Sequence, residues 1–243
     1  MTVRENLKTV QEKISRACRR AGRNPSEVGL VLITKNVSVE KIREAYEAGV
    51  RDFGENRVQE LCSKQPGLPS DIRWHFVGRL QTNKVKSILG GVHLLHSLDR
   101  LALAEEIQRQ AERKNLVVDA LVQVNTSGEP TKSGFAPGEV LEAARKLLSL
   151  NRIRLRGLMT IGPLTDDESF VRSSFVALRN LREALQKKFS RENFSHLSMG
   201  MSSDFEIAVE EGATFVRIGT AVFGERSRQS AVDSPQKEKD NGV

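Results

Sequence analysis

Lys35 is the residue whose position most directly predicts chemistry. It ends residues 28–35, an apolar run rich in β-branched side chains that is typical of a buried strand. At the end of such a strand the amine is partly desolvated, and desolvation lowers the pKa of a lysine. An amine that is partly neutral near pH 7 attacks aldehydes and forms a Schiff base. A solvated or salt-bridged lysine is the alternative that the position alone leaves open.

Two loops near the C-terminus have the composition of phosphate-binding loops. Met201 and Ser202 lie in residues 199–204, which join a predicted strand to a predicted helix. Gly219 and Thr220 follow the next predicted strand. Glycine permits close approach of the backbone, hydroxyls donate hydrogen bonds, and the start of a helix supplies free N–H groups. Ordinary helix capping by the serines is the alternative interpretation.

Further polar side chains stand in or just after other predicted strands. Arg217 lies between apolar neighbours, where an inward-pointing side chain would be a buried cation that needs a partner. Asn56, His75 and Met159 occupy comparable places on earlier strands. For Arg217 and His75 a purely structural role is the alternative. An aldehyde-binding lysine, phosphate-binding loops and an arginine facing a ring nitrogen together describe a site for pyridoxal 5′-phosphate.

The elements that would position these residues follow a regular alternation of strand and helix. Eight such strands in about 250 residues predict a single (β/α)₈ TIM barrel, whose functional residues gather at the C-terminal ends of the strands. A doubly wound open sheet is the alternative, but no GxGxxG follows the first strand. The predicted strands are 28–35, 52–54, 74–77, 92–97, 117–124, 154–159, 196–199 and 214–218, and the predicted helices are 3–21, 38–48, 57–64, 81–89, 99–114, 137–149, 167–189 and 203–211.

The two ends of the chain depart from this alternation. Residues 3–21 carry one apolar stripe and have no strand before them, whereas too few residues follow the eighth strand to form a full helix. We therefore expect the N-terminal helix to cover the barrel where the last helix is missing. Because this uses its only apolar stripe, we expect a monomer. The prediction is one barrel domain over 1–226 and a disordered polar tail over 227–243.

Composition excludes several classes of protein. No apolar run approaches the ~20 residues that span a bilayer, and the N-terminus lacks a signal core, so we expect a cytoplasmic protein without a membrane partner. The two cysteines, Cys18 and Cys62, have no metal-binding spacing, so we expect free thiols and no metal. The net charge is +7, and a basic first helix is all that favours nucleic acid. We therefore expect no nucleic-acid partner.

Motifs along most of the chain resemble those of the pyridoxal phosphate homeostasis protein family. The resemblance covers roughly residues 4–226, and the last two motifs are specific. One departure is that the family's proline three residues after the lysine is replaced by Ser38, which puts the conformation of that loop in question. The matching segments are Lys35, 53–56, 58–60, 74–78, 81–84, 123–125, 132–134, 156–159, 197–202 and 216–224.

The resemblance implies a barrel like the N-terminal domain of alanine racemase, which is the type III fold of pyridoxal phosphate proteins. It implies a cofactor carrier and regulator without established catalytic activity, whose partners would include pyridoxal phosphate-dependent apo-enzymes. A racemase-like enzyme is the alternative, but such enzymes bring a second acid/base from a C-terminal domain, and the chain ends soon after its eighth strand. The residues expected to bind the cofactor are Lys35, Asn56, His75, Met159, Met201, Ser202, Arg217, Gly219 and Thr220.

Overall fold

The computed structural model describes residues 2–190 and 192–224, and their strands close into one barrel. All neighbouring strands are parallel, and β1 pairs with both β2 and β8, so the sheet has no free edge. This confirms the predicted TIM barrel and rules out an open doubly wound sheet. The strands are β1 (Gly29–Ile33), β2 (Asp52–Glu55), β3 (Arg73–Phe76), β4 (Leu94–Leu98), β5 (Val118–Gln123), β6 (Ile153–Met159), β7 (His196–Ser198) and β8 (Phe215–Ile218).

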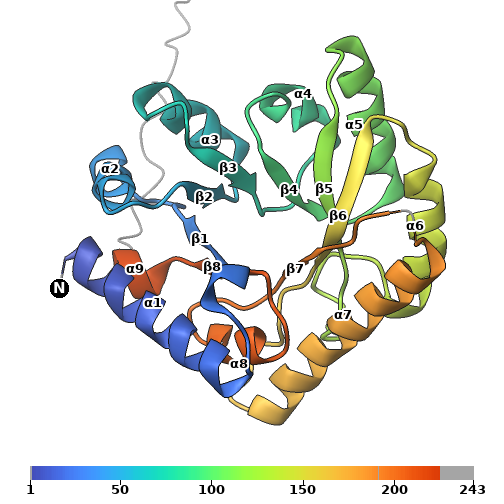
Figure 1. Cartoon of the computed structure of the whole chain (residues 1–243). Helices are drawn as coiled ribbons and strands as arrows, with labels where there is room; N and C mark the ends of the chain where they lie inside the picture. The colour runs from blue at the N-terminus through green and yellow to red at the C-terminus, as the bar shows by residue number, and fades with distance from the viewer. Residues whose placement is uncertain (1, 191, 225–243) are drawn as a thin grey trace, which may run out of the picture.

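Helices surround the strands on the outside of the barrel (Figure 1). The helix predicted over 81–89 is shorter than expected, because a 3₁₀ turn at Thr82–Lys84 precedes a single α-helical turn. The helices are α1 (Val3–Arg20), α2 (Val39–Glu47), α3 (Val58–Lys64), α4 (Val85–Ile88), α5 (Leu101–Arg113), α6 (Val140–Leu148), α7 (Glu168–Lys188), α8 (Phe205–Glu210) and α9 (Thr220–Phe223).

The main apolar core lies between the strands and the helices, and a small second cluster lies inside the barrel. Leu94, Leu121 and Met159 form this inner cluster, with Phe215 packed against it. Barrel interiors are usually filled by layers of branched apolar side chains. Here much of the interior is instead polar, and that polar part includes residues of the candidate site.

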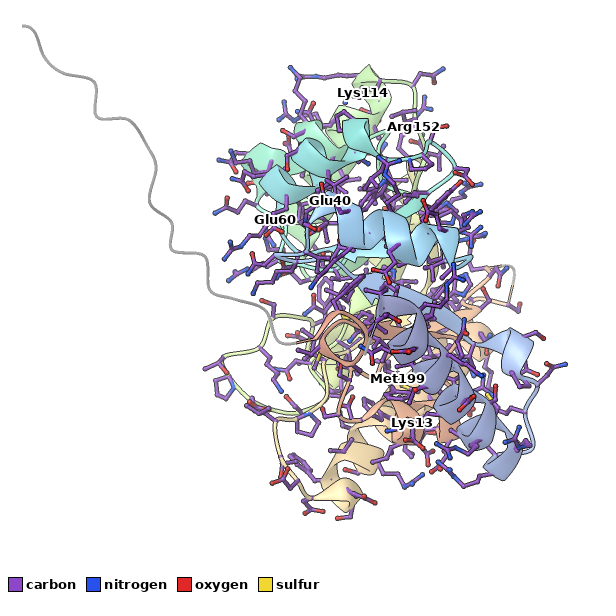
Figure 2. All side chains as sticks on the ribbon, turned by 90° about the vertical axis from the view of Figure 1, so that its left-hand side faces the viewer. Lys13, Glu40, Glu60, Lys114, Arg152 and Met199 are labelled. Atoms are coloured by element: carbon purple, nitrogen blue, oxygen red, sulfur yellow. The ribbon has the colours of Figure 1, made fainter. Side chains whose placement is uncertain are left out.

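The N-terminal helix packs where the alternation of strand and helix fails. Only the single turn α9 follows β8, and α1 lies alongside α9, α8 and α2 (Figure 1). The Asn6 amide donates to the Val222 carbonyl at 3.0 Å, and Lys13, labelled in Figure 2, lies 3.8 Å from Glu206 of α8. Arg20 adds contacts to the same helix. The prediction that α1 replaces the missing outer helix is confirmed.

The predicted disordered tail, 227–243, lies outside the described residues. Among the residues that are described, no helix is both long and apolar enough to cross a bilayer. Cys18 is buried and Cys62 exposed, and neither forms a disulfide in the described part of the chain.

Candidate functional site

Lys35 follows β1 at the C-terminal end of the barrel, where it is partly buried. Side chains alternate between the two faces of a strand. Val31 lies beside Arg217 in the β1–β8 register, and Arg217 shares a face with Phe215 of the inner cluster. Counting in steps of two from Val31 places Ile33, the last residue of β1, on the inner face, and Lys35 lies two residues further on, in the turn at that end. The lysine therefore belongs to the mouth of the barrel, as the sequence predicts.

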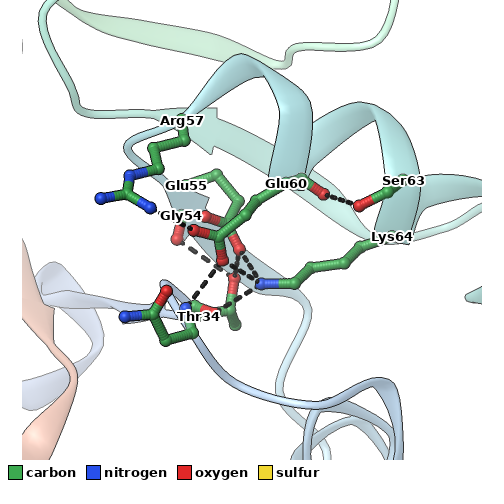
Figure 3. Close-up of polar contacts among 8 residues, drawn as sticks. Thr34, Gly54, Glu55, Arg57, Glu60, Ser63 and Lys64 are labelled. Carbon is green, nitrogen blue, oxygen red and sulfur yellow. Dashed lines mark hydrogen bonds and ion pairs between the residues drawn. The ribbon is translucent and has the colours of Figure 1, made fainter. Parts of the chain in front are cut away.

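A buried ionic cluster lies between the outer face of the barrel and α3, next to the loop that carries Lys35 (Figure 3). The Lys64 ammonium donates to the Thr34 carbonyl at 2.7 Å, to Glu55 Oε1 at 2.7 Å and to Glu60 Oε2 at 2.8 Å. Glu60 Oε2 also accepts the backbone N–H of Asn36 at 2.7 Å. The cluster thus binds the backbone on both sides of Lys35.

This cluster explains how the loop is held without the family's proline. Asn36 has a φ of 54°, a left-handed conformation that few non-glycine residues adopt but that asparagine tolerates. The hydrogen bond from Asn36 to Glu60 fixes that conformation. Lys64 comes four residues after Glu60 on one face of α3, and this spacing brings the two charges together.

The two carboxylates of the cluster differ in their environment. Glu55 is fully buried, and burial raises its pKa against the opposing hydrogen bonds from Lys64 and Thr34. Burial also acts on Glu60, but the hydrogen bonds from Lys64 and Asn36 outweigh it and lower the pKa. Glu55 is therefore a carboxyl group next to the Lys35 loop whose ionised form is disfavoured by burial.

Asn56 follows β2 and presents a polar atom that the described residues leave unsatisfied. Its Oδ1 is buried and has no hydrogen-bond partner among them. The backbone of Gly78 approaches so closely that a Cβ there would lie 2.1 Å from the Asn56 carbonyl oxygen. A buried acceptor without a partner is costly, and a ligand with a suitable donor would remove that cost.

The two predicted phosphate loops meet at the mouth. The backbone N–H of Ala221, next to Thr220, donates to the Ser202 hydroxyl at 3.4 Å. Gly200 has a φ of 91°, and a Cβ there would lie 2.5 Å from that of Ala208, so the tight turn into α8 requires glycine. Ser202 is thus brought together with the start of α9.

An acidic side chain shares this region. Asp204 Oδ1 accepts the backbone N–H of Met201 at 2.6 Å and so already uses one donor of the loop. Burial raises the pKa of Asp204, while the same hydrogen bond and the charge of Arg217 oppose the rise. The Met201 N–H is therefore engaged, and other N–H groups would have to meet a phosphate.

Arg217 is buried inside the barrel, and its guanidinium contacts β7 and the residue that follows β6. Its Nη1 donates to Ser198 Oγ at 2.6 Å and its Nη2 to the Thr160 carbonyl at 2.7 Å. Burial lowers its pKa to about 10, and the charge of Asp204 acts in the other direction. Arg217 therefore remains a cation near neutral pH.

The other predicted residues take different positions. Met159 is fully buried in the inner cluster at the end of β6. His75 is fully buried too, and both ring nitrogens are engaged, Nε2 by Asp52 at 3.0 Å and Nδ1 by His96 at 2.8 Å. It reaches Arg217 only through His96 and Ser198. The structure therefore joins His75 to the site through other side chains.

Sequence reasoning did not single out several residues that build the site. Lys64 and Glu60 carry a signal, because oppositely charged residues four apart on a helix form ion pairs. Ser198, Thr160 and His96 carry none, since strand register alone brings the first two to Arg217 and His96 to Ser198. Among the described residues, no group of three or more histidine, cysteine, aspartate and glutamate side chains is arranged to hold a metal ion.

Comparison with known proteins finds relatives that match nearly the whole chain. The family model described as "Alanine racemase, N-terminal domain" matches residues 5–227. The pyridoxal phosphate homeostasis protein of Aquifex aeolicus is 49% identical over 227 residues, which cover 93% of this chain and 99% of that protein. The protein of the same name from Escherichia coli is 39% identical and covers 92% and 97%.

Solved structures show the same fold. PipY of Synechococcus elongatus with pyridoxal phosphate bound superposes with a TM-score of 0.79 at 36% identity and covers 92% of this chain and 100% of PipY. An alanine racemase of Clostridium difficile gives a TM-score of 0.69 at 16% identity and covers 92% and 56%. The racemase likeness shows the fold alone.

Proposed function

Because the chain belongs to the pyridoxal phosphate homeostasis protein family, we propose that it binds pyridoxal 5′-phosphate and acts in holding and supplying this cofactor within the cell. The observation that carries the proposal is an amine and a guanidinium that adjacent strands bring to one end of the barrel. Lys35 and Arg217 reach that mouth from β1 and β8, which are adjacent strands.

The donor set of the mouth fits the chemistry of this cofactor. When bound, the cofactor supplies an aldehyde that condenses with an amine and a phosphate that needs several hydrogen-bond donors. Lys35 provides the amine and forms the Schiff base. The Ser202 hydroxyl and the backbone around Gly219 and Thr220 provide donors for the phosphate. The unsatisfied Oδ1 of Asn56 offers an acceptor in the same region.

Arg217 orients the cofactor ring. A guanidinium only donates hydrogen bonds, so facing the ring nitrogen it favours the unprotonated pyridine. An unprotonated ring is a weaker electron sink than a protonated one. This supports a carrier over an enzyme.

The enzymatic alternative is a racemase-like activity. The relatives that match nearly full length are named for homeostasis, whereas three solved alanine racemases are 15–16% identical and share the fold alone. We therefore propose that amino-acid turnover is not the role of this chain. A cytoplasmic location, a monomeric state and delivery to pyridoxal phosphate-dependent apo-enzymes belong to the same proposal.

Borohydride reduction of the cofactor-loaded protein tests the proposal. Reduction fixes the Schiff base, and peptide mapping should place the pyridoxyl label on Lys35. Lys35→Arg keeps the positive charge but should lose the label and the aldimine-type absorption, while Lys41→Ala, an exposed lysine on α2, should keep both. A label on a different lysine would contradict the site. Rapid racemisation or transamination of added amino acids would contradict the carrier role.

A further inference from the structure

A continuous chain of hydrogen-bonded side chains crosses the interior of the barrel. From the mouth, Arg217 Nη1 contacts Ser198 Oγ at 2.6 Å and Ser198 Oγ contacts His96 Nδ1 at 2.8 Å. His96 Nε2 contacts His75 Nδ1 at 2.8 Å, and His75 Nε2 contacts Asp52 Oδ1 at 3.0 Å. The chain links five strands: β8, β7, β4, β3 and β2.

The hydrogen-bonded series ends at Asp52, at the N-terminal ends of the strands and opposite the mouth of the barrel. Asp52 begins β2, and Arg73 begins β3 and binds Asp52 through two hydrogen bonds of 2.8 and 2.6 Å. Both residues line a cavity of about 630 Å³ at the N-terminal ends of the strands. Burial alone would raise the pKa of Asp52, but Arg73 and His75 hold it well below its ordinary value. Asp52 is therefore an ionised acceptor.

The two ends of the chain fix the direction of every hydrogen bond in it. A guanidinium only donates, so Ser198 Oγ accepts from Arg217, and the hydroxyl proton is left to donate to His96 Nδ1. His96 then carries its single proton on Nε2 and donates to His75 Nδ1. His75 likewise carries its proton on Nε2 and donates to Asp52, which only accepts.

The opposite direction meets a cost at the Asp52 end. If His96 donated to Ser198, its Nε2 would have to accept a proton from His75 Nδ1. A neutral His75 would then present a bare Nε2 to a carboxylate oxygen 3.0 Å away, two acceptors without a proton between them. Only a doubly protonated His75 or His96 would avoid this contact.

Burial disfavours that doubly protonated state. His75 and His96 are fully buried, and burial lowers the pKa of both, that of His96 well below its ordinary value. Among the groups that act on His75, Asp52 raises its pKa, whereas the charges of His93 and Arg73 lower it together with burial. Arg217, His75, His93 and His196 all act on His96 in the lowering direction.

We propose that His96 is a positioning residue for Arg217. Its Nδ1 accepts a hydrogen bond from the Ser198 hydroxyl, so that the lone pairs of that oxygen face the guanidinium. His96 in turn donates to His75, and His75 donates to Asp52. The role of Arg217 toward the ring rests on the proposed function. The arrangement of protons along the chain does not, because it follows from the protein's own side chains.

Nitrogen-15 NMR of the imidazole rings tests the proton arrangement without any cofactor. The whole protein has only four histidines, so single variants of His93 and His196 identify the signals of the remaining two. We expect His75 and His96 to be neutral near pH 7, with the proton on Nε2 and a bare Nδ1. A proton on Nδ1 of His96, or an imidazolium at His75, would overturn the inferred direction.

Variants at Ser198 and His96 test the positioning role in the cofactor-loaded protein. Ser198→Ala removes one of two acceptors of Arg217, and loss of such a bond should weaken pyridoxal phosphate binding about fivefold or more and shift the absorption of the bound cofactor. His96→Leu should do the same through Ser198. His96→Asn should restore both, because the asparagine Oδ1 can replace Nδ1 as acceptor.

Ser97→Ala is the matched control. Ser97 lies next to His96 on β4, is fully buried, and its hydroxyl has no hydrogen-bond partner among the described residues. It should leave affinity and spectrum unchanged. Equal spectra for wild type, Ser198→Ala and Ser97→Ala would overturn the positioning role, while wild-type protein that does not bind the cofactor would contradict the proposed function instead. If His96→Leu does not fold, the comparison of Ser198→Ala with Ser97→Ala and the histidine NMR signals still test the proposal.

Discussion

Replacing Lys64 by methionine removes the ammonium that ties α3 to the loop carrying Lys35. The ammonium makes three hydrogen bonds of 2.7–2.8 Å, to the Thr34 carbonyl, Glu55 and Glu60. The Lys64 side chain is 10% exposed and that of Glu55 is 0% exposed, so solvent cannot replace the lost partner of Glu55. Breaking a buried ion pair from one side costs about 3–5 kcal/mol, and we expect Lys64→Met to lose that much stability.

The dependence of this loss on pH follows from Glu55. Without the Lys64 hydrogen bond, burial raises the pKa of Glu55 further above its value in the unfolded chain. A raised pKa in the folded state stabilises below the unfolded value of about 4.3, and this contribution is lost as the pH rises through the folded pKa. The deficit of Lys64→Met should therefore be smallest near pH 4 and should grow toward neutral pH.

Urea unfolding at several pH values measures the deficit, and borohydride labelling of the folded variant measures the effect on Lys35. We expect slower labelling, because the backbone on both sides of Lys35 loses its anchor. Glu55→Gln/Lys64→Met should recover much of the stability, since the fully buried side chain at position 55 then carries no uncompensated charge. Lys41→Met, on the exposed surface of α2, should change stability by less than about 0.5 kcal/mol. A loss below about 1 kcal/mol with unchanged labelling would refute the reasoning.

Three further outcomes are expected. Pyridoxal should bind at least about tenfold more weakly than its phosphate ester, because the ester alone uses the donors around Ser202 and Thr220, and equal affinities measured by titration would remove the phosphate site. Arg217→Glu should change the absorption of the bound cofactor, and an unchanged spectrum would place the ring nitrogen elsewhere. Leu7→Ala, at a buried position on α1, should destabilise the fold by about 2–4 kcal/mol, and a negligible change in thermal unfolding would mean that α1 is not part of the barrel's cover.

The sequence by itself determined the elements of the fold and their order. Residues 28–35 are an uninterrupted apolar run, and residues 3–21 repeat apolar side chains every three or four positions, so each element is specified by neighbours along the chain. Counting eight such strands gave the barrel. Lys35, Ser202 and Arg217 were predicted to lie together for the same reason, because residues at the ends of parallel strands gather at one end of a barrel.

Only the tertiary structure decided which side chains meet. The sequence does not show that Lys64 reaches the Thr34 carbonyl, because that contact forms only when α3 packs against β2. His96 and Ser198 stand 102 positions apart, and their 2.8 Å hydrogen bond exists because the barrel closes with both side chains turned inward. Which faces meet across a closed barrel depends on strand register and on the irregularity between Leu95 and Leu98, and neither leaves a local pattern in the sequence.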